Sequence, residues 1–273
     1  MPANIKQIKS RIRSVDSTMH ITKAMELVAS SKFRKAVLLS EQGKPYFNAL
    51  LSAMTELYGA DSDYCREREV KKTCYIFIAG DRGLAGGYNS NIYKMVKSVA
   101  KKGDFCVAPI GKLAVDFAQK NGYEIIAKSN TVENMAMADC VKMGAELTAA
   151  YKNGEIDKIV VLYTEYVSVL TQTPLEVQIL PITEPQEKPD DFVLFEPSCE
   201  AVLEAIIPEY VCGMIYNYVG ESYASELAAR RTAMESASNN ASEMIDKLQL
   251  KYNRARQSAI TQEITEIIGG SAT

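Results

Sequence analysis

Hydrophobic positions at both ends of the chain follow the spacing of helices that pair side by side. Near the C-terminus they alternate in steps of four and three, through Leu227, Arg231, Met234, Ser238, Ala241, Ile245, Leu248, Tyr252, Ala255 and Ala259. Near the N-terminus the same steps join Ile5, Ile8, Ile12, Val15 and Met19, and the pattern continues less regularly through Ile21, Met25, Val28, Phe33, Ala36 and Leu39. This is the period of a left-handed two-stranded coiled coil. We expect the two termini to pair as antiparallel helices.

Both segments are unusually long for helices of a compact domain. Residues 3–42 and 221–268 contain neither glycine nor proline, and as helices they would measure roughly 60 and 70 Å. Neither contains 18 consecutive apolar residues, which excludes a membrane-spanning helix. Each apolar stripe is too narrow to bury a whole helix, so each helix needs a partner.

The C-terminal stripe changes face beyond Ala259. Gln262 and Glu266 fall where apolar residues are due, whereas Ile260, Ile264, Ile267 and Ile268 lie on another face. If the helix continues past its partner, this apolar tip requires a hydrophobic sleeve supplied by something else.

Between the helices the period changes to that of an α/β domain. The pattern predicts strands at 74–79, 105–110 and 158–164, helices at 89–100, 112–121 and 135–151, a further strand at 167–171 leading into a hairpin with 175–182, and a loop at 181–197. The fold class is therefore α/β, a Rossmann-like domain beside a long antiparallel coiled coil. The expected divisions are 1–58, 70–185 and 200–273, with the first and last pairing as one shaft.

Charge is unevenly distributed along this 273-residue chain, whose net charge is −3. The first 36 residues hold eight basic and two acidic side chains, and the middle of the chain is acidic. A basic helix could bind nucleic acid, an anionic membrane or an acidic protein surface, or could simply be solvated. Six scattered cysteines without a CxxC pair, with only the single His20 beside them, predict no metal site and mostly buried, reduced thiols. His20 is expected to be a surface or packing residue and not a catalytic one. No signal or transit segment is recognisable, which favours the cytoplasm.

A glycine-rich motif follows the first strand, at 80–87 (GDRGLAGG). It has neither the GxxxxGK[ST] spacing of a P-loop nor the GxGxxG spacing of a dinucleotide site. We therefore expect no cofactor there, and a structural or intersubunit contact for Asp81 and Arg82. No arrangement of acid, base and nucleophile is recognisable elsewhere, which favours a mechanical role.

Three segments together resemble the gamma subunit of F-type ATP synthase, and the resemblance covers nearly the whole chain. They are ITKAMELVASSK at 21–32, GDRGLAGGYN at 80–89 and YNRARQSAITQEITEI at 252–267. The resemblance implies a rotating shaft without a catalytic site. Its partners would be the alpha and beta subunits, the epsilon subunit and the c-ring of Fo, with no nucleic acid and with membrane contact only through Fo. It also implies a peripheral position on the cytoplasmic face of the cell membrane.

The same resemblance assigns contacts to individual residues. Lys23 and Met25 would face the acidic lever of a beta subunit. Contacts with the alpha and beta ring would also be made by Arg230, Arg256, Gln257, Thr261 and Glu266, and the apolar bearing would receive Ile264, Ile267 and Ile268. Phe195 and Glu196 would touch the c-ring; Phe195 stands where the family usually has tyrosine, which puts a hydroxyl contact in doubt.

The sequence also allows three other functions for this chain. A dinucleotide-dependent enzyme lacks its fingerprint, and a nucleic-acid scaffold would need more than one basic helix. A noncatalytic coiled-coil scaffold is the main alternative to the shaft.

Overall fold

A computed structural model describes residues 3–58, 60–66, 69–101, 103–183 and 194–270. The chain divides into two compact units, each considered separately below. One unit contains residues 1–30 and 230–273, and the other contains residues 31–229.

Two long helices begin and end the described chain. Helix α1 spans Ala3–Leu57 and helix α5 spans Cys199–Gly270. Both are longer than the stretches without glycine or proline, because α1 continues through Gly43 and Pro45 and α5 through Pro208. The start of α5 is capped by Ser198, whose Oγ accepts a hydrogen bond from the Ala201 backbone N–H at 3.3 Å. Serine is a favoured residue at this position because its oxygen satisfies an otherwise unpaired N–H group.

The α/β elements of the second unit follow the predicted order. They are β1 Lys72–Ile78, α2 Tyr88–Val99, β2 Asp104–Ile110, α3 Lys112–Lys120, α4 Met137–Lys152, β3 Lys158–Tyr166 and β4 Gln172–Leu180. The sheet order is β2-β1-β3-β4, in which β1 is parallel to both neighbours and β4 is antiparallel to β3. The strand expected at 167–171 is wrong. Ser168 and Thr171 exchange backbone hydrogen bonds there, so the segment is the tight turn that joins β3 to β4.

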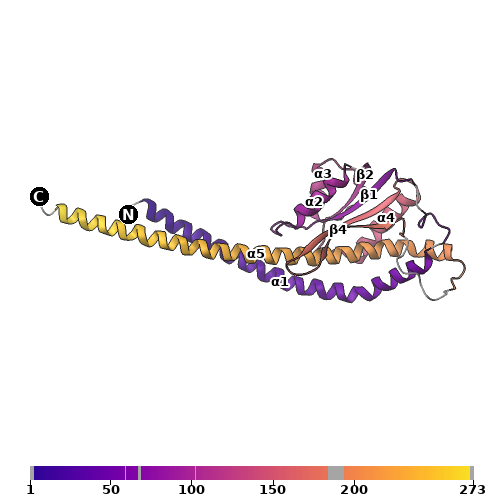
Figure 1. Cartoon of the computed structure of the whole chain (residues 1–273), viewed down its shortest axis with the longest axis horizontal. Coiled ribbons are helices and arrows are strands. Elements are labelled where there is room, and N and C mark those ends of the chain that lie inside the picture. The colour runs from indigo at the N-terminus through magenta and orange to yellow at the C-terminus, as the bar shows by residue number, and fades with distance from the viewer. Residues whose placement is uncertain (1–2, 59, 67–68, 102, 184–193, 271–273) are drawn as a thin grey trace. The chain divides into compact units, whose positions relative to one another are not determined.

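Helices cover both faces of this sheet (Figure 1). One face, with Tyr75 and Phe77 of β1, packs on α2 and α3. The other face, with Ile76 and Ile78, packs on α4, on the end of α1 and on the first turns of α5. The alternation of consecutive β1 residues between the two cores follows from the two-residue period of a strand. The continuous apolar run of β1 therefore reflects burial on both faces.

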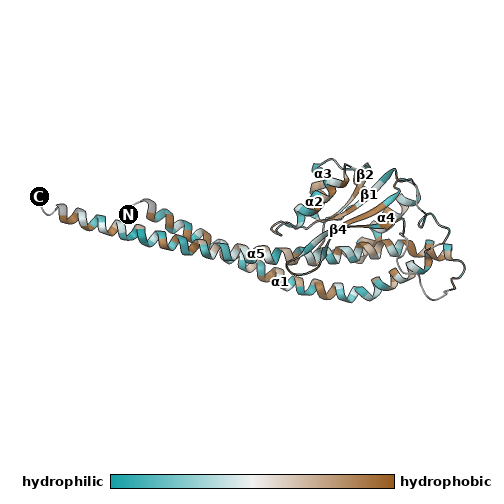
Figure 2. Ribbon diagram, in the orientation of Figure 1, coloured by the Kyte–Doolittle hydropathy of each residue, from teal (hydrophilic) through white to brown (hydrophobic). Residues whose placement is uncertain are grey.

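The long helices carry mixed surfaces. In Figure 2, hydrophobic and hydrophilic residues alternate along α1 and α5. Within the described residues, no helix is long and apolar enough to cross a membrane.

Candidate functional site: the paired terminal helices

The predicted seam on α5 is confirmed from Met234 to Ala259. Between residues 241 and 265, the only buried or half-buried side chains are those of Ala241, Ile245, Leu248, Tyr252, Ala255 and Ala259. Met234 and Ser238 precede them and are buried. Several of these residues are small, which allows a neighbouring backbone to approach closely. The seam therefore combines close helix contact with little apolar bulk.

The seam on α1 is confirmed up to Met19, and its predicted continuation is correct only in part. Ala36 is buried in a cluster with Leu227 of α5, and Phe33 packs against this cluster. Ile5 is buried, and Ile8, Ile12, Val15 and Met19 are half-buried. Beyond Met19 the regular steps continue through Thr22, Glu26 and Ala29, whereas Ile21, Val28 and Leu39 are exposed. The prediction missed these three residues because it required apolar side chains, whereas Thr22 and Glu26 are polar and Ala29 is small. Continuing the three-and-four spacing strictly, without requiring apolar residues, would have found them.

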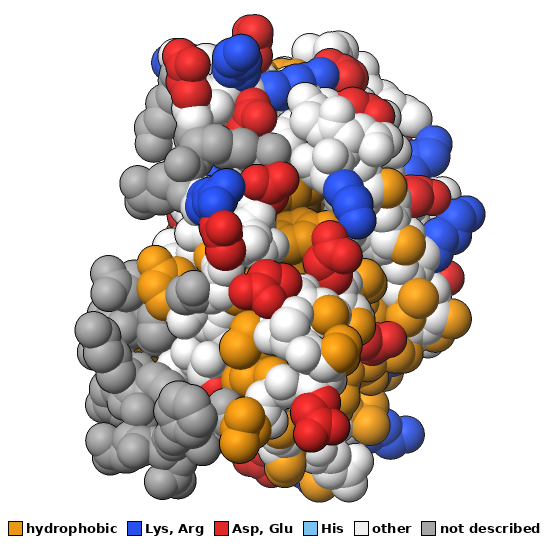
Figure 3. All heavy atoms as spheres, turned by 90° about the vertical axis from the view of Figure 1, so that its right-hand side faces the viewer, with side chains coloured by type: hydrophobic (Ala, Val, Ile, Leu, Met, Phe, Trp, Pro, Cys, Tyr) orange, Lys and Arg blue, Asp and Glu red, His pale blue; other side chains and the backbone are white. Residues whose placement is uncertain are grey.

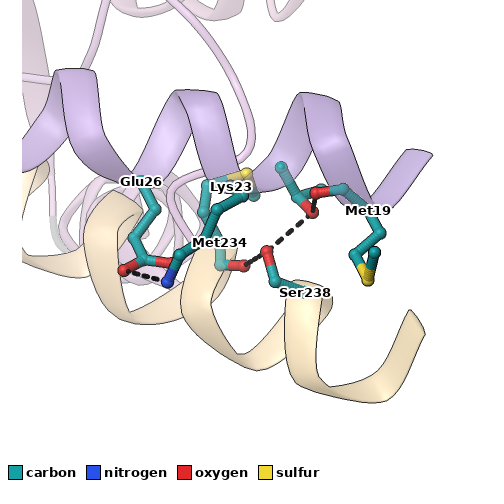
Figure 4. Close-up of polar contacts among 6 residues, drawn as sticks. Met19, Lys23, Glu26, Met234 and Ser238 are labelled. Atoms are coloured by element: carbon teal, nitrogen blue, oxygen red, sulfur yellow. Dashed lines mark hydrogen bonds and ion pairs between the residues drawn. The ribbon is translucent and has the colours of Figure 1, made fainter. Parts of the chain in front are cut away.

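A pair of hydroxyl groups joins the two helices inside the seam. The Oγ1 atom of Thr22 lies 2.8 Å from the Oγ atom of Ser238. Each hydroxyl also lies close to a carbonyl of its own helix, Thr22 at 3.0 Å from Met19 O and Ser238 at 2.9 Å from Met234 O. In Figure 4, Ser238 reaches from α5 toward α1, and the numbering of the labelled residues shows that the helices are antiparallel. A polar pair at a buried seam position favours one register over its neighbours.

A charged pair lies beside these hydroxyls. The Nζ atom of Lys23 lies 3.0 Å from the Glu26 carboxylate, and the Lys23 side chain is 58% exposed (Figure 4). The Glu26 side chain is only 13% exposed, in keeping with its place in the seam. An ion pair three residues apart on a helix contributes only about a few tenths of a kcal/mol. The lysine thus faces outward with part of its charge offset by Glu26. Met25 is half-buried on the same turn.

The last turns of α5 expose both polar and apolar side chains. Arg256, Gln257 and Thr261 are exposed, and the Thr261 hydroxyl donates to the Gln257 carbonyl at 3.0 Å. Ile264, Ile267 and Ile268 are 51%, 71% and 63% exposed. The side chain of Glu266 is outside the described residues, and Arg230, near the start of this unit's α5 segment, is half-buried.

The two residues assigned to the c-ring belong to the other unit. Phe195 is half-buried and packs against the larger core, while Glu196 is exposed. Figure 3 views the end of this unit where α1 ends and α5 begins, and there acidic, basic and apolar side chains are interspersed. Several charged residues of this region line a shallow cavity, among them Asp61, Asp63, Arg66, Lys152, Glu200 and Glu204.

Asp81 of the glycine-rich motif has a structural role. Its carboxylate accepts hydrogen bonds from the backbone N–H groups of Lys112, Val132 and Glu133 and from the Thr131 hydroxyl. The acid thereby holds the segment before α4 against the β1–α2 loop. A second acid near the motif was not predicted: Glu226 of α5 is 3% exposed and lies against Gly80.

The remaining reactive side chains are mostly buried. All six cysteines are free thiols, and Cys74, Cys106, Cys140 and Cys212 are buried. Burial raises the pKa of Cys140 to about 12, which keeps it protonated at neutral pH. Among the described residues, no three His, Cys, Asp or Glu side chains could hold a metal ion. His20 is exposed, which selects the surface position from the two alternatives, surface or packing residue.

Together these features define a class: a stalk protein built from antiparallel terminal helices, with a three-layer α/β domain encoded between them. A protein-family model described as ATP synthase matches residues 4–273. The ATP synthase gamma chain of Alkaliphilus metalliredigens is 44% identical over 99% of both chains, and that of Ruminococcus albus is 43% identical over 98% of both. The sodium-ion-specific gamma chain of Acetobacterium woodii is 40% identical over 99% of both. The chain belongs to the ATP synthase gamma-chain family.

The fold also matches a solved structure. A chain in the OSCP/F1/c-ring structure of Euglena gracilis mitochondrial ATP synthase superposes with a TM-score of 0.75 at 20% identity. The match covers 100% of the present chain and 95% of that chain.

Proposed function

We propose that this chain is the central rotor shaft of an F-type ATP synthase and couples ion flow through the c-ring to ATP synthesis and hydrolysis by rotation. It has no catalytic site of its own, because the ATP chemistry belongs to the alpha and beta subunits. The observation that carries the proposal is the helix pair of a gamma-family chain, whose seam ends at Ala259 while α5 continues with four exposed isoleucines.

The isoleucine tip is the part of the shaft that needs a partner most. Exposed apolar side chains gathered at one place mark an interaction site. We assign Ile264, Ile267 and Ile268 to an apolar bearing formed by the alpha and beta subunits. Such a bearing can hold the tip at every angle, because apolar contact is not directional.

Polar residues below the tip provide the angle-dependent contacts. In this proposal Arg256, Gln257 and Thr261 form an upper contact with the ring, with Arg230 and Glu266 as further contact positions. Lys23 and Met25 face the acidic lever of a beta subunit. The outward position of the Lys23 ammonium group supports this role, and the Glu26 carboxylate moderates its charge.

In this proposal, residues of the other unit contact the membrane sector. Phe195 and Glu196 are proposed to meet the c-ring, with the epsilon subunit alongside. The core contacts of the Phe195 ring suit a hydrophobic anchor, and the exposed Glu196 suits a charged contact. The protein would then lie at the cytoplasmic face of the cell membrane as a peripheral subunit, and its membrane contact would be through Fo.

Coupling in this arrangement follows from thermodynamic linkage. One asymmetric shaft inside a threefold ring makes three chemically identical sites unequal. A shaft angle that changes nucleotide affinity is itself favoured by nucleotide occupancy. Inverting a two-state preference from 1:99 to 99:1 requires about 5.5 kcal/mol of differential affinity. The shaft must therefore resist twisting, and the long helices without interruption in residues 3–30 and 230–268 provide that stiffness.

Reconstitution tests the proposal directly. Purified alpha and beta subunits are assayed for ATP hydrolysis with this chain, without it, and with this chain alone as a control. We expect sustained hydrolysis only when all three are present. Hydrolysis by the chain alone, or equal activity of the ring without it, would refute the shaft role.

A second assay tests coupling in the membrane-bound complex. Met25→Lys places a second charge beside Lys23, and Ala24→Lys places the same charge on an exposed neighbouring position. We expect Met25→Lys to lower the protons or sodium ions pumped per ATP hydrolysed by more than it changes nucleotide affinity. Equal pumping ratios in the two variants would contradict the assigned lever contact.

A further inference from the structure

A cavity of about 380 Å³ opens within the unit of residues 31–229. It lies between α1, α5 and the segment that leads into α4. Its apolar lining includes Leu39 and is rich in aromatic and sulfur-containing side chains, among them Tyr46, Phe47, Met135, Met137 and Tyr216. Its volume falls in the range of small-molecule sites in proteins, about 300–1,000 Å³. Neither the rotor function nor the family contacts account for it.

Two glycines on facing helices keep the cavity open. Gly43 of α1 and Gly220 of α5 both line it, and a Cβ atom built on either would meet no heavy atom within 4 Å. Gly213 also lines the cavity but is different, because its Cβ would lie 2.6 Å from Leu50 Cδ1. A side chain at Gly213 would therefore meet the tip of Leu50, whereas Gly43 and Gly220 leave empty space that a ligand could use.

The charged residues of the lining determine which ligand fits. They are Lys32, Lys35 and Glu133, and Lys32 and Glu133 form an ion pair with each other. Lys35 is exposed and makes no ion pair with any residue that the structure describes. The lining thus has an apolar body and one uncompensated positive charge.

We infer that this cavity binds a small amphipathic anion, with an apolar chain or ring and a single carboxylate or similar group. The apolar part would lie between Gly43 and Gly220 against the aromatic side chains, and the anionic group would lie near the Lys35 ammonium group. Burial of the apolar part supplies most of the affinity, since an exposed charge pair contributes little. The site is independent of the rotor function proposed above.

Calorimetric titration of the full chain tests this with three probes of equal chain length: decanoate, decanol and decyltrimethylammonium. We expect decanoate to bind most tightly and the cation most weakly. Lys35→Gln should weaken decanoate about two- to fivefold and leave decanol unchanged, because the charge contact is exposed. Equal affinity for the three probes, or an equal effect of Lys35→Gln on decanoate and decanol, would overturn the proposal.

Filling the cavity provides the second test. Gly220→Leu should weaken decanoate and decanol at least tenfold, and Gly83→Leu is the matched control. Gly83 lies in an exposed loop of the same unit, and its Cβ would also meet no atom within 4 Å. If Gly220→Leu does not fold, Gly43→Leu carries the same test from the other helix. Unchanged binding in a folded variant would overturn the proposal.

The assembled complex separates a small ligand from a protein partner. We expect the alpha, beta and epsilon subunits to leave decanoate binding intact. If they abolish it, and if Gly220→Leu weakens their assembly with the chain, the cavity is a protein-docking surface and the small-ligand proposal is wrong.

Discussion

The hydroxyl pair between Thr22 and Ser238 makes a measurable contribution to the helix pair. Three oxygen–oxygen contacts of 2.8 to 3.0 Å involve these two hydroxyls. Each hydroxyl has one proton to donate, so two protons serve three contacts. If one hydroxyl is removed, the other can donate to its own helix carbonyl. Neither single substitution therefore leaves a buried hydroxyl without a partner.

The expected loss is that of one interhelical hydrogen bond, about 0.5–1.5 kcal/mol. Thr22→Val keeps the shape and the branched Cβ, and so changes helix propensity little. Ser238→Ala regains up to about 0.5 kcal/mol of helix propensity, which partly hides its loss. A double-mutant cycle cancels that propensity term because it occurs in both branches. We expect a coupling free energy of about 1 kcal/mol between the two sites.

Native-state hydrogen exchange measures this locally, through the opening free energies of the amides at 19–26 and 234–241. Thr18→Val is the matched control, because the Thr18 hydroxyl is exposed and bonds only to Ser14 O of its own helix. Thr18→Val combined with Ser238→Ala should be additive within about 0.5 kcal/mol. If Thr22→Val and Ser238→Ala are equally additive, the hydroxyl pair does not fix the register and the reasoning is wrong.

Three further predictions concern packing and pH. Ala29 is buried in the seam, so Ala29→Leu should overfill it and lower the local opening free energy by about 1–3 kcal/mol. Ala24→Leu, at an exposed site, should change it by no more than about 0.5 kcal/mol. Hydrogen exchange of nearby amides measures both, and equal effects would argue against the seam. Gly80→Ala should cost a similar amount, about 1–3 kcal/mol in urea unfolding, since its Cβ would lie 2.4 Å from Glu226 Oε1, and an effect no larger than that of Gly83→Ala would contradict this. Burial, and then the neighbouring Glu165, raises the pKa of Glu221, so its ionisation opposes folding and stability falls as pH rises through the folded-state pKa. Glu221→Gln should therefore stabilise the protein at pH 7 and lose this advantage below about pH 4, where the carboxyl is protonated in both states; a gain that is independent of pH would refute the assignment.

The sequence by itself determined the period of the helix pair and the order of the α/β elements. Its α5 seam was predicted correctly from Met234 to Ala259, because a coiled-coil repeat is a local property of the chain. The β1 run was recognisable because burial on both faces selects continuous apolar residues. The spacing of apolar residues also placed Ile264 on a different helix face from the seam, and Ile264 is exposed. The sequence also predicted either a structural or an intersubunit contact for Asp81, and its hydrogen bonds show a structural contact.

Apolarity by itself did not identify which residues of α1 continue the seam, although the strict three-and-four spacing contains them. Ile21 and Val28 are more apolar than Thr22 and Ala29, yet they are the exposed ones, because the angle around the helix axis decides burial and hydrophobicity does not. The pairing of Thr22 with Ser238, the contact of Glu226 with Gly80 and the cavity between Gly43 and Gly220 each join segments more than 100 residues apart. Such contacts depend on how elements that are distant in the sequence pack together. The spacing of residues within one helix or strand does not determine that packing.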